Sequence, residues 1–483
     1  MTRATTLAAL QARHGARYRW LLLLAVMVGA MAAIMSSTIM NVAVPDLSAH
    51  FGLGQERAQW INSSFMVAMT VAMLTTPWML ARHGYRHVYY AAMWLMLTGG
   101  VIGGLSNDYT LVLAARVAEG LAAGVVQPIP AIIILRAFDP HEQGRASGIF
   151  GMGVVLAPAL GPSIGGLLVD WMGWRSIFFM VVPLCLVSIW LAQRYVPTSA
   201  PGGATAGQDR APLDWVGLLL AAAGTISLLN GLVQWHAGVL TGATVLLAVA
   251  AVLLLVFWWR MRRLGAAGAT PAPLLNLALF ASRPFAMGSL VAFIYGMALF
   301  GSTYLIPVFM QLGLGLSPSH VGAILLPAGL VLAFTIALAG RLADRQPTHV
   351  LVSIGIGLLA ASFALMALVD SGSAIALLIA LATLGRIGLG FILPSLNLGS
   401  MRGLAPALIP QAASAINVIR MLGGAVGVSL CGIVLEWRLA AHGASATRLA
   451  AFDETFTLLA LLCALALPAA WRLRQTIART GLG

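Results

Sequence analysis

Residues 148–166 read GIFGMGVVLAPALGPSIGG and decide the class of this protein. The stretch holds six glycines and two prolines but no charged residue. In a helix surrounded by water, each interior glycine would cost about 1 kcal/mol and each proline about 3 kcal/mol relative to alanine. In a membrane, small residues let helices approach closely, and neighbours satisfy the backbone groups that proline frees. We interpret the stretch as a closely packed spanning helix, which forms either a moving interface or a static one.

The composition of the whole chain agrees with that interpretation. Of its 483 residues, 60% are hydrophobic and only 8% are charged, and the mean hydropathy is +0.94. An average soluble domain has about 25% charged residues. A backbone that crosses lipid must satisfy its own hydrogen bonds, so apolar runs of about twenty residues are expected to be helices. The sequence therefore predicts an all-α polytopic membrane protein.

Fourteen apolar runs have the length of a membrane span. They cover residues 19–41, 58–80, 88–106, 110–132, 144–168, 175–195, 213–234, 239–259, 285–309, 320–340, 348–369, 374–398, 411–435 and 455–471. We expect fourteen transmembrane helices.

The 27 basic residues are all arginine, and their positions predict the orientation. With the N-terminus in the cytoplasm, twenty arginines fall in inside segments and only four in outside segments. Because arginine is enriched in cytoplasmic loops, both termini are expected to be cytoplasmic. This placement also accounts for the net charge of +13, and we expect no nucleic-acid partner. The three cysteines lie in separate apolar runs, so neither a disulfide framework nor a metal site is expected.

Two linkers rich in glycine, alanine and proline divide the predicted helices. They bracket an apolar helix pair at residues 213–259, which looks like an insertion between two pseudo-symmetric six-helix bundles. The predicted parts are an N-terminal bundle at 1–196, a cytoplasmic linker at 197–212, the inserted pair, a second cytoplasmic linker at 260–283 and a C-terminal bundle at 284–483.

The two predicted bundles share short sequence features. Arg116 precedes Gly120 by four residues, as Arg386 precedes Gly390, and the loop ARHGYRH at 81–87 corresponds to ADRQPTH at 343–349. Internal duplication, with a binding site near the repeat interface, is typical of secondary transporters.

With these motifs in place, the chain resembles the major facilitator superfamily, and within it the fourteen-helix drug:proton antiporter branch. The opening stretch resembles the antiporter motif of helix 5, SSTIMNVAVP at 36–45 resembles the helix 1 signature, and residues 411–427 resemble that of helix 13. The motif residues in helix 5 are Gly153, Pro158, Gly161, Pro162, Gly165 and Gly166. The residues that match the cytoplasmic gating loops are Arg82, Gly84, Arg86, Gly340, Asp344 and Arg345.

The chain departs from the family pattern at two acidic positions. Ser36 stands where the helix 1 signature usually begins with aspartate, and Ala81 stands at the acidic position of the first gating loop. One carboxylate often tied to coupling and one loop ion-pair partner are therefore missing.

Four ionisable residues lie deep in the predicted spans, where each charge costs at least about 2.5 kcal/mol. Arg116 and Glu119 share one helix face and are the predicted proton-coupling pair. A permanent structural ion pair and direct substrate contact are the alternatives. Arg386 and Arg420 either bond to backbone carbonyls or form a positive cavity that favours anionic substrates.

Polar and aromatic residues inside the apolar runs are candidates for the lining of a substrate cavity, although such a residue taken singly more often makes a helix-packing hydrogen bond. With the two deep arginines, Arg386 and Arg420, the candidates are Ser36, Ser37, Asn41, Trp60, Asn62, Ser63, Gln127, Tyr295, Tyr304, Asn397 and Asn417.

The resemblance implies a multi-pass transporter of the bacterial inner membrane that exchanges protons for amphipathic drugs by alternating access. A dedicated or uncoupled exporter or importer of one metabolite class is the alternative, because Ser36 and Ala81 break the family pattern. We expect no enzyme activity and no cofactor. The expected partners are membrane lipids, protons and a small-molecule substrate. A periplasmic adaptor and an outer-membrane channel, which some relatives use, are further candidates.

Overall fold

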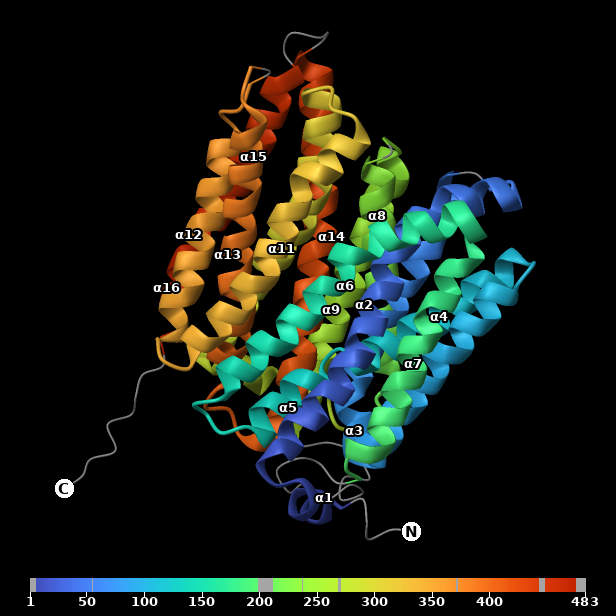
Figure 1. Cartoon of the computed structure of the whole chain (residues 1–483), viewed down its shortest axis with the longest axis vertical. Helices are drawn as coiled ribbons and strands as arrows, with labels where there is room; N and C mark the ends of the chain where they lie inside the picture. The colour runs from blue at the N-terminus through green and yellow to red at the C-terminus, as the bar shows by residue number, and fades with distance from the viewer. Residues whose placement is uncertain are drawn as a thin grey trace, which may run out of the picture. The chain divides into compact units, whose positions relative to one another are not determined.

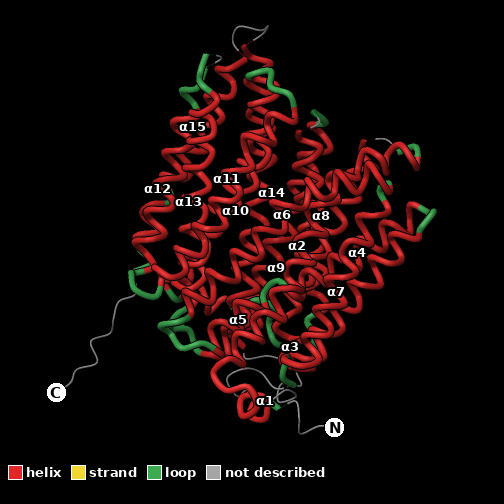
Figure 2. Tube along the Cα trace, viewed as in Figure 1, coloured by secondary structure: helices red, strands yellow, loops and turns green. Residues whose placement is uncertain are grey.

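The computed structural model describes residues 6–53, 55–198, 212–236, 238–267, 271–370, 372–442 and 448–474. These residues form helices joined by short loops and turns, and no strand occurs among them (Figure 1, Figure 2). The prediction of an all-helical polytopic protein is confirmed.

The α-helices are α1 (Leu7–His14), α2 (Tyr18–Phe51), α3 (Gln55–Leu105), α4 (Tyr109–Val126), α5 (Ile129–Ala137), α6 (Gln143–Met172), α7 (Arg175–Tyr195), α8 (Trp215–His236), α9 (Leu240–Ala267), α10 (Arg283–Val308), α11 (Pro318–Ala343), α12 (Thr348–Met366), α13 (Ile375–Met401), α14 (Ile409–His442), α15 (Arg448–Leu465) and α16 (Leu467–Trp471). Short 3-10 turns lie at Gly15–Arg17, Leu277–Ala281 and Pro406–Leu408, and one π-helical turn, Phe309–Gly313, continues α10.

Twelve helical stretches of the described chain are long and apolar enough to cross a membrane, so the predicted count of fourteen is not confirmed. One of the twelve, Trp60–Leu105, is 46 residues long. At 1.5 Å per residue it would extend about 69 Å, roughly twice the thickness of the hydrocarbon core of a bilayer. The helix α6 is not among the twelve, although it has 30 residues.

Gly84 explains the unusual length of α3. Its backbone angles are φ 78° and ψ 162°, which are non-helical, and the helices on either side of it meet there end to end. Only glycine adopts this region without strain, because a Cβ would collide with the neighbouring peptide groups. Gly84 lies inside the loop predicted at residues 81–87, so the turn between two helices occurs where the sequence places it.

The chain falls into two compact units. Unit 1 consists of Met1–Asp139, Ile149–Leu277 and Ala405–Val418, and unit 2 of Pro140–Gly148, Ala278–Leu404 and Ile419–Gly483. The helices α6 and α14 contribute to both units, and they carry the glycine-rich stretch and its counterpart at 411–427. The domain boundaries proposed from the linkers remain a prediction.

Unit 1 has an apolar core between α2, α3, α4 and α7. Its buried members include Ile39, Ile61, Val112, Ala115 and Phe178. Glycines let α4 approach α3 closely: a Cβ on Gly120 would meet the backbone of Phe65, and a Cβ on Gly124 would meet that of Met69. The position of α4 against α3 is therefore set by backbone contact, and its buried polar side chains are fixed with it.

The helices α8 and α9 pack against each other as a pair within unit 1. Asp214 is 1% exposed and lies directly before α8. Its carboxylate accepts hydrogen bonds from Arg260 of α9, at 2.7 Å from Nη2 and 2.9 Å from Nε. This two-pronged contact ties the two helices together at one end.

Unit 2 is built on close approaches between glycine-bearing helices. A Cβ on Gly296 of α10 would meet the carbonyl of Arg420 on α14, and Gly423 and Gly427 of α14 face the backbone of α10 in return. Gly355 of α12 and Gly388 of α13 face each other in the same way. These contacts set the separation of α10 from α14 and of α12 from α13.

We expect Gly84→Ala to lower the free energy of unfolding by about 1–3 kcal/mol, because alanine at these backbone angles is strained. Gly357→Ala on α12 is the matched control, since a Cβ there has no neighbour within 4 Å. Unfolding in detergent micelles, followed by tryptophan fluorescence, measures both. Equal stability of the two variants would contradict the role assigned to Gly84.

Candidate functional site

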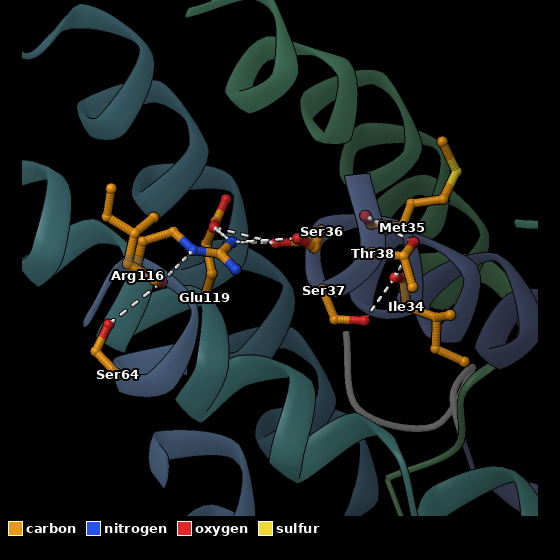
Figure 3. Close-up of polar contacts among 9 residues, drawn as sticks. Ile34, Met35, Ser36, Ser37, Thr38, Ser64, Arg116 and Glu119 are labelled. Carbon is orange, nitrogen blue, oxygen red and sulfur yellow. Dashed lines mark hydrogen bonds and ion pairs between the residues drawn. The ribbon is translucent and has the colours of Figure 1, made fainter. Parts of the chain in front are cut away.

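Arg116 and Glu119 form an ion pair in the interior of unit 1 (Figure 3). They lie three residues apart on α4, and Arg116 Nη1 is 2.7 Å from Glu119 Oε2. Arg116 is 0% exposed and Glu119 is 1% exposed. The structure thus places the predicted pair at depth, with both charges removed from solvent.

Ser36 on α2 joins both members of the pair. Its hydroxyl accepts a hydrogen bond from Arg116 Nη1 at 2.9 Å and donates one to Glu119 Oε2 at 3.1 Å. The side chain is 2% exposed. Where the family signature usually has aspartate, this chain has a neutral bridge, and the carboxylate beside the arginine comes from Glu119 on α4 instead.

Two further contacts of Arg116 come from α3. Its Nε donates to the Ile61 carbonyl at 3.2 Å, and its guanidinium lies over the Phe65 ring with 4.3 Å between Cζ and the ring centroid. A cation over an aromatic face is attracted by the ring quadrupole, most strongly where water is excluded. Neither contact was predicted from the sequence. The available signal was Gly120, since a glycine one turn from a buried arginine indicates that another helix comes close.

The pair leaves two polar atoms without a hydrogen bond. Among the described residues, Arg116 Nη2 and Glu119 Oε1 have no partner. The carboxylate lies against α3, where a Cβ on Gly100 would be 3.6 Å from Oε1. An open lone pair on a buried carboxylate is a position that can take a proton, because a neutral carboxylic acid is far cheaper to bury than a charge.

The other predicted cavity residues of unit 1 are spread over several elements. The Ser37 hydroxyl donates to the Ile34 carbonyl of its own helix at 2.7 Å. Trp60, Asn62 and Ser63 are partly exposed on α3, and Gln127 is partly exposed at the end of α4. The side chain of Asn41 lies outside the described part of the chain.

Three of the predicted residues come together in unit 2. Tyr295 on α10 interacts electrostatically with both Arg386 on α13 and Arg420 on α14. Tyr295 is 4% exposed, whereas both arginines are partly exposed. We call these three residues the arginine–tyrosine cluster.

The other predicted residues of α10, α13 and α14 are Tyr304, Asn397 and Asn417, and each has different surroundings. Tyr304 is nine residues from Tyr295, which places it on the opposite face of α10, and it interacts with Glu436 instead. Asn417 is buried and donates from Nδ2 to the Ala413 carbonyl at 2.8 Å. Asn397 is partly exposed three turns from Arg386 on the same face of α13.

The second gating loop holds the start of α6. Asp344, directly after α11, accepts hydrogen bonds from the backbone N–H of Gly144 at 2.6 Å and of Arg145 at 2.7 Å. Gly340 lies against the backbone of Gly144 and Gly148. A carboxylate at a helix N-terminus satisfies free N–H groups and interacts favourably with the helix dipole. Asp344 and Gly340 therefore act together on one end of α6.

Arg402 also lies at this contact between Asp344 and the start of α6, although it was not among the residues predicted from the sequence. Its guanidinium is 3.8 Å from Asp344, and it donates to the Pro140 carbonyl at 2.8 Å. Arg345, which the resemblance implied, is exposed. Burial raises the pKa of Asp344 above its ordinary 3.8, against the opposing effect of the two N–H donors and Arg402.

The first gating loop is held differently, because Ala81 offers no carboxylate. Arg86 donates to the carbonyls of Gln193 at 3.0 Å and Val196 at 3.2 Å, at the end of α7. The Arg82 guanidinium lies 5.5 Å from the Trp78 ring centroid. With Gly84 as the turn, this loop is anchored to α7 by backbone carbonyls.

Only some residues of the helix 5 motif, which lies on α6, have described surroundings. Gly153 faces Met27 and Gly165 faces Ile39, both on α2, so α6 and α2 approach closely at these glycines. The side chains of Pro158 and Pro162, and the surroundings of Gly161 and Gly166, lie outside the described residues.

An all-helical, multi-pass membrane protein with buried charges in its spanning helices has the architecture of a membrane transporter. The family model of the Major Facilitator Superfamily matches residues 26–235 and 214–428. The chain belongs to this superfamily, whose members are in general transporters and not enzymes, and the resemblance seen in its motifs is confirmed.

Curated relatives carry names of drug transport. The chain is 28% identical over 410 residues to a multidrug resistance protein B homolog of Mycobacterium tuberculosis, with 83% of this chain and 73% of the relative covered. It is 27% identical over 432 residues to the multidrug export protein EmrB of Haemophilus influenzae, with 87% and 81% covered. Its fold is similar to that of the human organic anion transporter MFSD10, with a TM-score of 0.65, 15% identity, and 94% and 99% of the two chains covered.

We expect Arg116→Met to lower the free energy of unfolding by about 3–5 kcal/mol, because it leaves Glu119 buried without its counter-charge. The double variant Arg116→Met/Glu119→Gln should cost less than the sum of the two single variants. Denaturation in mixed micelles measures this cycle. Arg19→Met is the control: its Asp139 partner is 60% exposed, and such a pair contributes at most about 1 kcal/mol. Equal losses for Arg116→Met and Arg19→Met would refute the buried pair.

We expect Asp344 to make stability depend on pH. Because its pKa is raised in the folded protein, the native carboxyl binds a proton at a pH where the unfolded chain is still ionised. The contribution of this group to the unfolding free energy therefore falls as pH rises through the range just above 3.8. Melting temperatures across that range should show this slope in the wild type and a weaker slope in Asp344→Asn. Parallel slopes would count against it.

Proposed function

We propose that this protein is a proton-coupled efflux transporter for amphipathic compounds, located in a bacterial inner membrane with both termini in the cytoplasm. The names of the drug-transporting relatives and the arginine distribution support this proposal. We further propose fourteen spans: the twelve candidate stretches with α3 counted as two helices on either side of Gly84, and α6 as the fourteenth.

The observation that carries proton coupling is the state of the Glu119 carboxylate. One oxygen, Oε2, holds Arg116 and Ser36, while the other, Oε1, has no hydrogen-bond partner among the described residues. In our proposal a proton binds at Oε1. Protonation removes the negative charge, and the attraction between Glu119 and Arg116 falls accordingly.

Arg116 has other partners to turn to once Glu119 is neutral. They are the Ser36 hydroxyl and carbonyl on α2 and the Ile61 carbonyl on α3. In this proposal protonation weakens the contact of Arg116 with its own helix, and its remaining hydrogen bonds go to α2 and α3. This change biases how α4 packs against its neighbours, which is what alternating access requires of a proton.

The gating loops support the same proposal at the helix ends. Asp344 and Arg402 hold the start of α6, the helix that continues into the glycine-rich stretch. Gly153 and Gly165 of α6 lie against the side chains of Met27 and Ile39 of α2, so α6 contributes no side chain of its own at these two contacts. In our proposal α6 moves along α2 at these contacts when the Asp344 carboxylate releases the backbone N–H groups at the N-terminus of α6.

An uncoupled transporter of a single metabolite class is the second candidate. Ser36 favours it, because a neutral hydroxyl bridges Arg116 and Glu119 at the position where the family pattern usually has a second carboxylate. In that case Glu119 would stay ionised throughout the cycle and Arg116 would never leave it.

A comparison of the wild type with Glu119→Gln in inside-out vesicles decides between the two candidates, because an uncoupled wild type would not accumulate substrate under an imposed pH gradient. We expect the variant to lose accumulation driven by an imposed pH gradient, down to the level of protein-free vesicles, while exchange of substrate across the membrane without a gradient continues. Glutamine keeps the shape of the protonated acid and cannot cycle.

Arg283→Gln, at the exposed start of α10, is the control for loss of one charge elsewhere. Undiminished gradient-driven accumulation by Glu119→Gln would remove Glu119 as the coupling site.

A further inference from the structure

We propose that a groove between α12 and α16 is a binding site for one anionic phospholipid, such as phosphatidylglycerol. The two helices lie side by side in unit 2 (Figure 1). The groove has a volume of about 380 Å³ and is lined by Ser353 of α12, by Leu467, Pro468 and Trp471 of α16, and by Arg472 directly after α16. Binding of a lipid here does not require the proposed transport function.

The groove lies where two antiparallel spans end at the same membrane surface. At this end the rings of His349 and Trp471 meet edge to face, with 5.3 Å between their centroids. Toward the other end of the helices Phe363 stacks on Phe456. The spanning stretch of α12 begins at Thr348, and the stretch that contains α15 and α16 ends at Trp471. In the proposed orientation this surface is the cytoplasmic one.

Pro468 shapes the wall of the groove that α16 provides. A proline inside a helix removes one hydrogen bond and its ring clashes with the preceding turn, and here α15 ends at Leu465 while α16 begins at Leu467. Pro468 is exposed and Trp471 is 57% exposed, so both rings face outward from the bundle. Tryptophan is enriched at membrane surfaces because its ring is apolar while its N–H can reach water.

Beyond the groove, the surface of α12 has room for an acyl chain. Gly357 lies one turn after Ser353 on the same face of the helix, and a Cβ on it would meet nothing within 4 Å. Ile354, which lies between them, is 45% exposed. A chain that leaves the groove can therefore follow α12 toward the hydrocarbon core.

Two arginines give this end of the groove a positive charge. Arg472 and Arg474 are exposed, whereas Leu473 between them is 0% exposed and lies close to Gly288 of α10. Neither arginine makes an ion pair with any residue that the structure describes. The sequences of α12 and of residues 455–474 contain no acidic residue. The charge of the groove is therefore complementary to a lipid phosphate.

The chemistry of the lining suits a phosphate that is attached to apolar chains. A guanidinium donates paired N–H bonds to phosphate oxygens, and basic pockets between spanning helices at the cytoplasmic side bind anionic headgroups. The Ser353 hydroxyl has no hydrogen-bond partner among the described residues, and rotation about its Cα–Cβ bond can turn it toward an ester or phosphate oxygen. A free phosphate would leave the apolar side chains of Leu467 and Trp471 without a contact, whereas an acyl chain covers them.

Native mass spectrometry of the full-length protein in detergent tests this inference. Titration with phosphatidylglycerol and with phosphatidylcholine of the same acyl chains gives the Kd of the first bound lipid. We expect phosphatidylglycerol to bind about thirtyfold more tightly, because two arginines near a membrane surface each favour an anionic lipid by about fivefold. Glycerol phosphate and inorganic phosphate, which carry the charge without the chains, should bind at least about a hundredfold more weakly than phosphatidylglycerol.

Arg472→Gln and Arg474→Gln should each weaken phosphatidylglycerol binding by about fivefold, and the double variant should bind the two lipids equally. Arg472→Lys, which keeps the charge, should lose less than Arg472→Gln. Both positions are exposed, so these variants are expected to fold, and melting temperatures in the same detergent check this. The matched control is Arg263→Gln at the end of α9. It also removes an exposed arginine beside a tryptophan, since Arg263 Cζ is 3.6 Å from the Trp259 ring centroid, and it should bind both lipids as the wild type does.

Equal affinity of the wild type for the two lipids would overturn the inference. It would also fail if the double variant kept the preference for phosphatidylglycerol, or if Arg263→Gln lost as much of that preference as Arg472→Gln. Inorganic phosphate or glycerol phosphate that bound as tightly as phosphatidylglycerol would identify a site for a free anion and exclude the lipid.

Discussion

The ion pair of Arg116 and Glu119 is the constraint on which unit 1 depends. Two charges that are removed from water must pair with each other and with the polar groups around them. Each charged or polar atom left without a partner in a low-dielectric interior raises the free energy of the folded state. In this chain Arg116 pairs with Glu119 on the same face of α4, and it also contacts the Ser36 hydroxyl of α2, a backbone carbonyl of α3 and an aromatic ring of α3. Three helices are thereby tied to one guanidinium. Packing between apolar faces alone would allow α4 to slide or rotate, whereas the pair fixes its register.

Close packing by glycine supplies the second constraint, and the two work together. Gly120 lies one turn after Arg116 and brings α4 to the backbone of α3, which is what places the Phe65 ring over the guanidinium. In unit 2 the same device brings α10 to α14 and sets Tyr295 beside Arg420. The small residues therefore have an electrostatic effect, since they decide how near a charge comes to its partners.

The sequence predicts the fold class and the deep charges because both follow from simple local rules. Hydropathy and length give helices in a membrane, and a charge in an apolar run stands out at once. The turn at Gly84 and the i, i+3 pair on α4 are local features and were found in this way. The bridging role of Ser36 and the hold of Arg402 on Asp344 were not, because they depend on which helices come together in space. The sequence around position 402 does not distinguish that arginine from the other arginines near helix ends. The count of spans depends on single residues, since the non-helical backbone of Gly84 alone divides α3 into two helices.

The contact between Asp214 and Arg260 has a consequence for how the α8–α9 pair relates to the rest of the chain. The buried carboxylate at the start of the pair is neutralised by an arginine of the same pair. The Asp214 carboxylate therefore needs no counter-charge from another helix, and the two further arginines of α9, Arg262 and Arg263, lie toward the C-terminal end of the helix. Removal of the pair would likewise leave no orphaned charge behind. In electrostatic terms the pair is self-contained, so a twelve-helix and a fourteen-helix version of this architecture can differ by one hairpin without any change in the charges of the other helices.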